Sequence, residues 1–95
     1  MKESLDQIRN YMLRHRNTLA VAESVTAGNL QAALSQAEAA TDFFQGGITT
    51  YNVGQKSLQL QIDPIYGLSC NCVSERIAIE MAQNVCALLK PCSLM

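Results

Sequence analysis

Hydroxyl groups and one lysine are the side chains of this sequence best suited to chemistry. Ser24 and Thr26 follow a short apolar run, and Tyr51 and Lys56 follow a second run rich in β-branched residues. A lysine removed from water can lose its proton and activate a hydroxyl group or a water molecule, and a tyrosine can relay a proton. The alternative is a solvated surface lysine and a Ser24 or Thr26 that merely caps a helix. The residues alone leave both interpretations open.

Other kinds of catalytic or metal site find little support. The only histidine, His15, has polar helical neighbours, which disfavours a Ser-His-Asp or Cys-His arrangement. No glycine-rich phosphate loop or dinucleotide fingerprint occurs. The spacing of the four cysteines does not match common zinc sites, so we expect no metal site. These cysteines are Cys70, Cys72, Cys86 and Cys92. No secretory signal is recognisable, so we expect a cytoplasmic protein with reduced thiols, and the apolar helical pattern around Cys86 predicts a core residue.

Two predicted strands would place the hydroxyl groups and the lysine. The apolar residues 18–22 predict a buried strand, and residues 48–51 predict a second one after a break at residues 45–47. Because neighbouring parallel strands end at the same edge of a sheet, Ser24 and Lys56 can meet there. Apolar residues at helical spacing predict helices over 3–16, 25–37, 53–62 and 74–89, with short turns at 41–44 and 65–67.

Strands separated by helices predict an α/β architecture, but two strands make a poor sheet. Three explanations remain open: that a third strand lies near residues 69–72, that another chain completes the sheet, or that the domain is cut short.

Composition narrows the classes of partner. The 95 residues suffice for one domain, and 7 basic against 8 acidic residues give a net charge of −1. That balance argues against a dedicated binder of nucleic acid or of anionic membranes, which would carry a basic excess. No apolar run approaches the length of a membrane-spanning helix, so we expect no membrane partner.

Four blocks of the sequence, in order, resemble one known family. The segment A-E-S-V-T-A-G at residues 22–28 resembles the A-E-S-C-T-G-G motif of the CinA C-terminal domain, the competence/damage-inducible or nicotinamide mononucleotide deamidase family. Residues 44–51 resemble its F-x-G-G-x-x-T-Y, and Lys56 stands five residues after Tyr51, as the family lysine does. Residues 73–82 are similar to its V-S-x-x-V-A-x-E-M-A helix.

The resemblance implies a fold and a reaction. The fold would be a three-layer α/β/α domain with a small mixed sheet. The reaction would hydrolyse the carboxamide of nicotinamide mononucleotide, a small nucleotide substrate, and release ammonia without a cofactor. Carried over residue by residue, the catalytic positions are Ser24, Thr41, Tyr51 and Lys56, with Thr41 in place of a family serine. The substrate-binding positions are Glu23, Thr26, Gly28 and Gly47.

A mechanism follows from the resemblance as an expectation. Lys56 takes a proton from Ser24 or Thr41, the resulting alkoxide attacks the amide carbon, and backbone N–H groups at residues 26–28 stabilise the oxyanion. Tyr51 helps to pass a proton to the leaving ammonia.

The sequence also departs from the family. Val25 and Ala27 replace its cysteine and glycine, and Asn52 follows Tyr51 where the family has a serine-asparagine pair. Family domains run to about 160 residues, so we expect residues 1–95 to form a single, truncated domain. Helix faces left without cover would favour a homo-oligomer. The alternative to an enzyme is a non-catalytic relative that self-associates or holds a nucleotide-like anion at residues 24–28.

Overall fold

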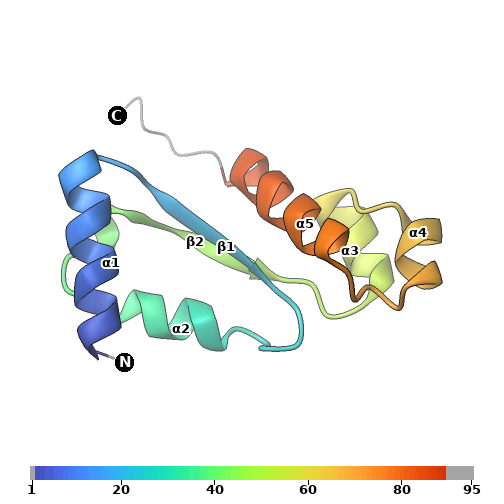
Figure 1. Cartoon of the computed structure of the whole chain (residues 1–95), viewed down its shortest axis with the longest axis horizontal. Coiled ribbons are helices and arrows are strands. Elements are labelled where there is room, and N and C mark those ends of the chain that lie inside the picture. The colour runs from blue at the N-terminus through green and yellow to red at the C-terminus, as the bar shows by residue number, and fades with distance from the viewer. Residues whose placement is uncertain (1, 90–95) are drawn as a thin grey trace.

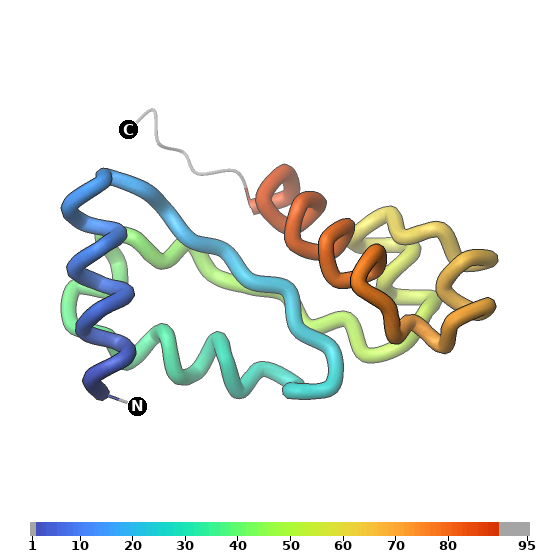
Figure 2. The backbone as a smooth tube through the Cα atoms, in the orientation of Figure 1, coloured from blue at the N-terminus to red at the C-terminus, as the bar shows by residue number. Residues whose placement is uncertain are grey.

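Two short parallel strands form the centre of the structure, and helices pack on both of their faces (Figure 1). The computed structural model describes residues 2–89. Figure 2 traces the same path as a tube, from the first helix through the strands to the last helix. The elements in chain order are α1 (Lys2–His15), β1 (Leu19–Glu23), α2 (Asn29–Ser35), the 3-10 turn η1 (Ala40–Asp42), β2 (Phe44–Thr49), α3 (Val53–Leu60), α4 (Pro64–Ser69) and α5 (Glu75–Leu88). The predicted α/β class is confirmed.

The alternation of side chains along β1 divides the apolar interior into two cores. Leu19 and Val21 pack against one core, and Ala20 and Ala22 pack against the other, because successive strand residues point to opposite faces. The α1–α2 core consists of Leu5, Leu34, Ala37 and Phe43. The α5 core consists of Leu60, Ile62, Ile77, Met81 and Val85. The helices, the strand pair and the opposite helices therefore make the three layers of an α/β/α arrangement, in which the two described strands run parallel.

The second strand starts earlier than its sequence suggests. The predicted break at residues 45–47 is wrong, because these residues lie inside β2. The glycines do mark an irregularity. The pairing passes from Leu19 opposite Phe44 to Ala20 opposite Gly46, which leaves Gln45 as an extra residue. Gly46 has φ +125°, a conformation that only glycine adopts readily, so it allows this bulge without ending the strand.

Three helices begin at side-chain caps that the sequence signals clearly. Asn52 accepts a hydrogen bond from the Gln55 amide at the start of α3, and Ser74 accepts one from the Ile77 amide at the start of α5. Asp63 caps α4 by accepting a hydrogen bond from the Ile65 amide, and Pro64 occupies the first helical position. These caps fix where α3 and α5 begin, and both beginnings face the site described below.

Two further expectations are corrected by the structure. Residues 69–72 end α4 and form a turn, so no third strand lies there. Cys86 is exposed rather than buried, because the buried face of α5 carries Ile77, Met81 and Val85, and Cys86 points away from it. The predicted helix stop at Pro91 and the last cysteine, Cys92, lie outside the described residues.

Part of the apolar surface of the helices is exposed in the described part of the chain, as the sequence led us to expect. Leu30 on α2 and Ile79 and Leu88 on α5 are about half exposed. Within residues 2–89, no helix has the length and apolar character needed to cross a bilayer.

Candidate active site

The pairing of the two strands brings their carboxyl ends to one edge of the sheet. Glu23, the last residue of β1, lies opposite Thr49, the last residue of β2, and the Thr50 amide donates to the Glu23 carbonyl at 2.9 Å. Ser24 and Tyr51 therefore leave the sheet at the same edge. The prediction that these two segments meet is confirmed by this register.

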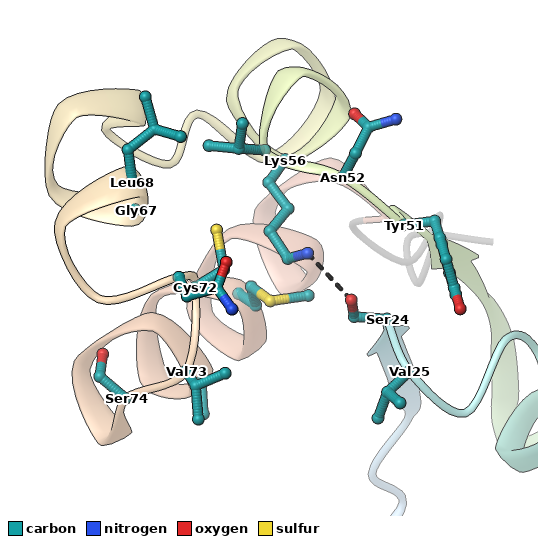
Figure 3. A pocket seen from close by; sticks show the side chains of 14 residues that line it. Ser24, Val25, Tyr51, Asn52, Lys56, Gly67, Leu68, Cys72, Val73 and Ser74 are labelled. Carbon is teal, nitrogen blue, oxygen red and sulfur yellow. Dashed lines mark hydrogen bonds between the residues drawn. The ribbon is translucent and has the colours of Figure 1, made fainter.

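Lys56 reaches back from α3 to the end of β1. Its Nζ donates a hydrogen bond to Ser24 Oγ at 2.9 Å, and the dashed line in Figure 3 marks this contact. Only 3% of Lys56 is exposed, so its ammonium is withdrawn from water. Among the described residues, no carboxylate lies within 4.0 Å of Nζ to balance its charge. The interpretation of Lys56 as a solvated surface lysine is therefore wrong.

The Ser24–Lys56 contact opens into a pocket of about 580 Å³, within the range of small-molecule sites. Residues from the ends of both strands and from α3, α4 and α5 line it. Tyr51 stands at its edge with 68% of its surface exposed, and Figure 3 shows the ring beside Ser24. The pocket is lined by Ser24, Val25, Tyr51, Asn52, Val53, Lys56, Gly67, Leu68, Asn71, Cys72, Val73, Ser74, Ala78 and Met81.

Glu23 has a structural task beside this pocket. Its carboxylate accepts hydrogen bonds from Thr26 Oγ1 at 2.7 Å and from the amides of Leu30 and Gln31 at 2.9 and 2.8 Å. The last side chain of β1 therefore accepts hydrogen bonds from the first amides of α2, which would otherwise lack partners within the helix. Its negative charge also interacts favourably with the positive end of the helix dipole. The simpler interpretation, in which Ser24 or Thr26 caps α2, is wrong. The cap position is Gly28, which makes no side-chain hydrogen bond.

These contacts keep Glu23 ionised. Burial raises the pKa of Glu23, but the hydrogen bonds from Thr26, Leu30 and Gln31 together outweigh it and lower the pKa from 4.5 to about 2. The anion at the start of α2 is thus supplied by the protein itself.

The other residues expected to bind substrate hold this framework in place and do not line the pocket. Gly28 has φ +99°, which favours glycine, and Thr26 is bonded to Glu23. Gly47 lies within β2, where a Cβ atom would come within 2.6 Å of the Gln31 side chain and 2.7 Å of Val21 Cγ2. For Glu23, Thr26, Gly28 and Gly47, the structure therefore provides roles in folding.

Thr41 lies at the opposite end of the sheet from Ser24 and Lys56. It is an exposed residue of η1, just before β2 begins, and β2 spans about 17 Å at roughly 3.3 Å per residue. Within one chain, Thr41 cannot exchange a proton with Lys56. Of the two hydroxyl groups expected to serve as the nucleophile, only that of Ser24 contacts Lys56 within one chain.

The pocket also contains residues that the sequence did not single out. Asn52, Asn71 and Cys72 line it, and Asn71 and Cys72 both have φ near +55°. The cap role of Asn52 has a local signal, because asparagine is a preferred helix cap. No local pattern marks the other two, since the packing of α4 against α3 and α5 sets their positions. Among residues 2–89, no group of three or more histidine, cysteine or acidic side chains is arranged to hold a metal ion.

Comparison with known proteins identifies the family. The model of the CinA C-terminal domain matches residues 2–92. A CinA-like protein of Koribacter versatilis is 35% identical over 83 residues, which are 86% of this chain and 20% of that protein. A putative competence-damage inducible protein of Listeria monocytogenes is 36% identical over 88 residues, 92% of this chain and 21% of its own length. The chain thus spans about a fifth of the curated relatives it matches.

A solved structure agrees with these matches. The crystal structure of a competence-damaged protein (CinA) superfamily member from Escherichia coli superposes with a TM-score of 0.87 at 28% identity, over 93% of this chain and 52% of that one. With the strand order, the Ser24–Lys56 contact and the matched family model, the chain belongs to the CinA C-terminal domain family.

Proposed function

We propose that this chain is an amidohydrolase that converts the carboxamide of nicotinamide mononucleotide to the carboxylic acid and releases ammonia. The observation that carries the proposal is the 2.9 Å contact between Lys56 Nζ and Ser24 Oγ inside a pocket of small-molecule size. A serine beside a buried lysine is one of the arrangements that activate a hydroxyl nucleophile. Membership of the CinA C-terminal domain family supports the choice of substrate through the resemblance described above.

In the first half of the reaction, Ser24 becomes acylated. Lys56 first gives one ammonium proton to water, and its Nζ then accepts the Ser24 hydroxyl proton as Oγ forms a bond to the amide carbon. The tetrahedral intermediate then collapses, the C–N bond breaks, and the proton passes from Lys56 to the nitrogen that leaves as ammonia. Tyr51, at the edge of the pocket, helps to pass this proton to the leaving group.

In the second half, water hydrolyses the acyl ester. Lys56 accepts a proton from the water as its oxygen attacks the ester carbon, and returns the proton to Ser24 Oγ when the C–O bond to the enzyme breaks. Asn71 lines the pocket and offers a side-chain amide as donor to the oxyanion, whereas Asn52 is engaged in capping α3. Thr26 and Gly28 do not line the pocket, so this proposal assigns the oxyanion site to Asn71 instead of residues 26–28.

The geometry gives less support to the non-catalytic alternative. An anion held at residues 24–28 would need free amides at the start of α2. The Glu23 carboxylate already accepts the amides of Leu30 and Gln31 there. A second negative charge at the same place would be repelled by Glu23.

Ammonia release from nicotinamide mononucleotide tests the proposal. Ser24→Ala and Lys56→Ala should each lower the rate by about 100-fold or more, because each removes a reacting group. Thr41→Val is the matched control, since it removes a hydroxyl at the far end of the sheet and should leave the rate unchanged. Far-ultraviolet circular dichroism checks that each variant is folded. Full activity in folded Lys56→Ala, or loss of activity in Thr41→Val, would contradict the proposed mechanism.

A further inference from the structure

We propose that the pocket binds the carboxylate product more tightly than the amide substrate, so that the product acid inhibits the enzyme. This inference rests on the proposed function, because it concerns the product of that reaction. It adds a form of regulation to the site, in which accumulated acid slows its own formation.

The charges around the pocket are strongly unbalanced. Of the fourteen lining residues, Lys56 is the only one with a basic side chain, and none is acidic. The recorded hydrogen-bond partner of Nζ is the uncharged Ser24 hydroxyl, which can occupy one of the three donor positions of an ammonium group. A buried cation without a balancing anion is costly, and an anionic ligand would remove that cost.

The nearby buried carboxylate does not supply the missing charge. Glu23 is 3% exposed and ends the strand that leads to Ser24, but its oxygens are engaged by Thr26, Leu30 and Gln31. It does not line the pocket. An acidic ligand is therefore the partner that the site itself lacks.

The remaining walls strengthen an ion pair and suit a flat ring. Val53 and the buried Met81 line the pocket with apolar atoms, and Figure 3 shows the more exposed Leu68 and Val73 on the side of the pocket away from Tyr51. Apolar walls lower the local dielectric constant, so a charge pair gains more there than in water. An aromatic acid would place its ring against these side chains and its carboxylate at Nζ.

The reaction leaves the two charges in contact. Hydrolysis of the acyl ester first gives the neutral acid beside Lys56. The acid then transfers its proton to Nζ, which yields a carboxylate and an ammonium group at hydrogen-bond distance. The amide substrate offers the same lysine an uncharged carbonyl oxygen, so it gains a hydrogen bond without the attraction between opposite charges.

Matched ligands measure this preference without turnover. Ser24→Ala chain is titrated by calorimetry with nicotinic acid mononucleotide and with nicotinamide mononucleotide, which share their phosphate, ribose and ring. The acid should bind about tenfold more tightly, because only the acid adds the attraction between opposite charges to the hydrogen bond with Lys56. Adding Lys56→Met should abolish the preference, whereas Lys2→Met, which removes an exposed lysine on α1, should preserve it.

The outcomes separate the two proposals. Turnover by the natural chain together with equal affinities for acid and amide overturns the inference and leaves the proposed function standing. Absence of turnover together with a Lys56-dependent preference for the acid overturns the proposed function and supports the preference for a carboxylate. A preference that survives Lys56→Met, or no binding of either nucleotide to folded Ser24→Ala chain, overturns the inference.

Discussion

Replacing Lys56 with methionine should stabilise the fold while it abolishes activity. Methionine matches the length and apolar character of the lysine stem and removes the charge from a side chain that is only 3% exposed. Replacing a buried ion pair with apolar residues of similar volume is often neutral or stabilising by about 1–4 kcal/mol, and Lys56 lacks even the carboxylate partner that offsets burial in such a pair. The lost hydrogen bond to Ser24 subtracts about 1 kcal/mol.

The net expectation is a gain of about 0–3 kcal/mol in the free energy of unfolding, from the two contributions just given. For a domain of this size, each 1 kcal/mol raises the melting temperature by about 4–8 °C. Thermal unfolding followed by circular dichroism measures the shift, and ammonia release measures the activity of the same sample. The Lys2→Met variant controls for the loss of one positive charge from the surface.

A structural lysine would behave differently. If Lys56→Met unfolds several degrees below the natural chain, the lysine contributes to stability through contacts that the argument above does not include. In that case its burial cannot be attributed to chemistry. Increased stability with undiminished activity would refute the catalytic role directly.

Four further predictions concern the framework around the pocket. Glu23→Gln should be less stable than the natural chain at neutral pH. Because folding lowers the pKa of Glu23 from 4.5 to about 2, its contribution to the free energy of unfolding is present above pH 4.5 and is lost as the pH falls through about 2. Urea unfolding at several pH values should therefore show a smaller stability difference between the natural chain and Glu23→Gln in acid than at neutral pH. Gly47→Ala should cost about 1–3 kcal/mol in the same assay, because the new Cβ would lie within 2.7 Å of two side chains; Gly54→Ala, inside α3 and with only a 3.4 Å neighbour, should instead be neutral or stabilising. Ala27→Gly should raise the melting temperature, since Ala27 has φ +54°, and a lower value would show that this turn is not strained. Self-association is the last prediction, and a monomeric mass by light scattering from a chain that melts cooperatively would contradict it.

Local signals in the sequence were sufficient for much of the fold. The cap residues Asn52, Asp63 and Ser74 act on the backbone within three positions, so a reader of the sequence can see both partners of each contact. The order of strands and helices follows from periodicity in the same way. The meeting of Ser24 and Lys56 was predictable as a neighbourhood because parallel strands end together.

Contacts between distant segments account for what could not be predicted. From the sequence alone, Gly47 indicates a break between elements; the structure shows that it lies in β2, where the Gln31 side chain packs against it. From the sequence alone, Glu23 is a candidate to bind substrate; the structure shows that it accepts hydrogen bonds from the start of α2. Cys86 falls one position from the buried row of α5, a rotation that the helical period alone cannot fix. Thr41 was placed by resemblance, which gives position in the chain but not position in space.

The division of the interior into two cores separates the residues of the α1–α2 core from the residues that line the pocket. Its lining residues come from the strand ends and from α3, α4 and α5, whereas the α1–α2 core touches the opposite face of the strands. Substitutions at Leu5 or Leu34 reach the pocket only through the backbone of β1 and β2. Random substitutions in the first forty residues, apart from Glu23 and Ser24, should therefore mainly change the amount of folded protein in a cell. They should change the ligand affinity and activity of the folded protein less. The α1–α2 layer can therefore change in sequence without altering the residues that line the pocket.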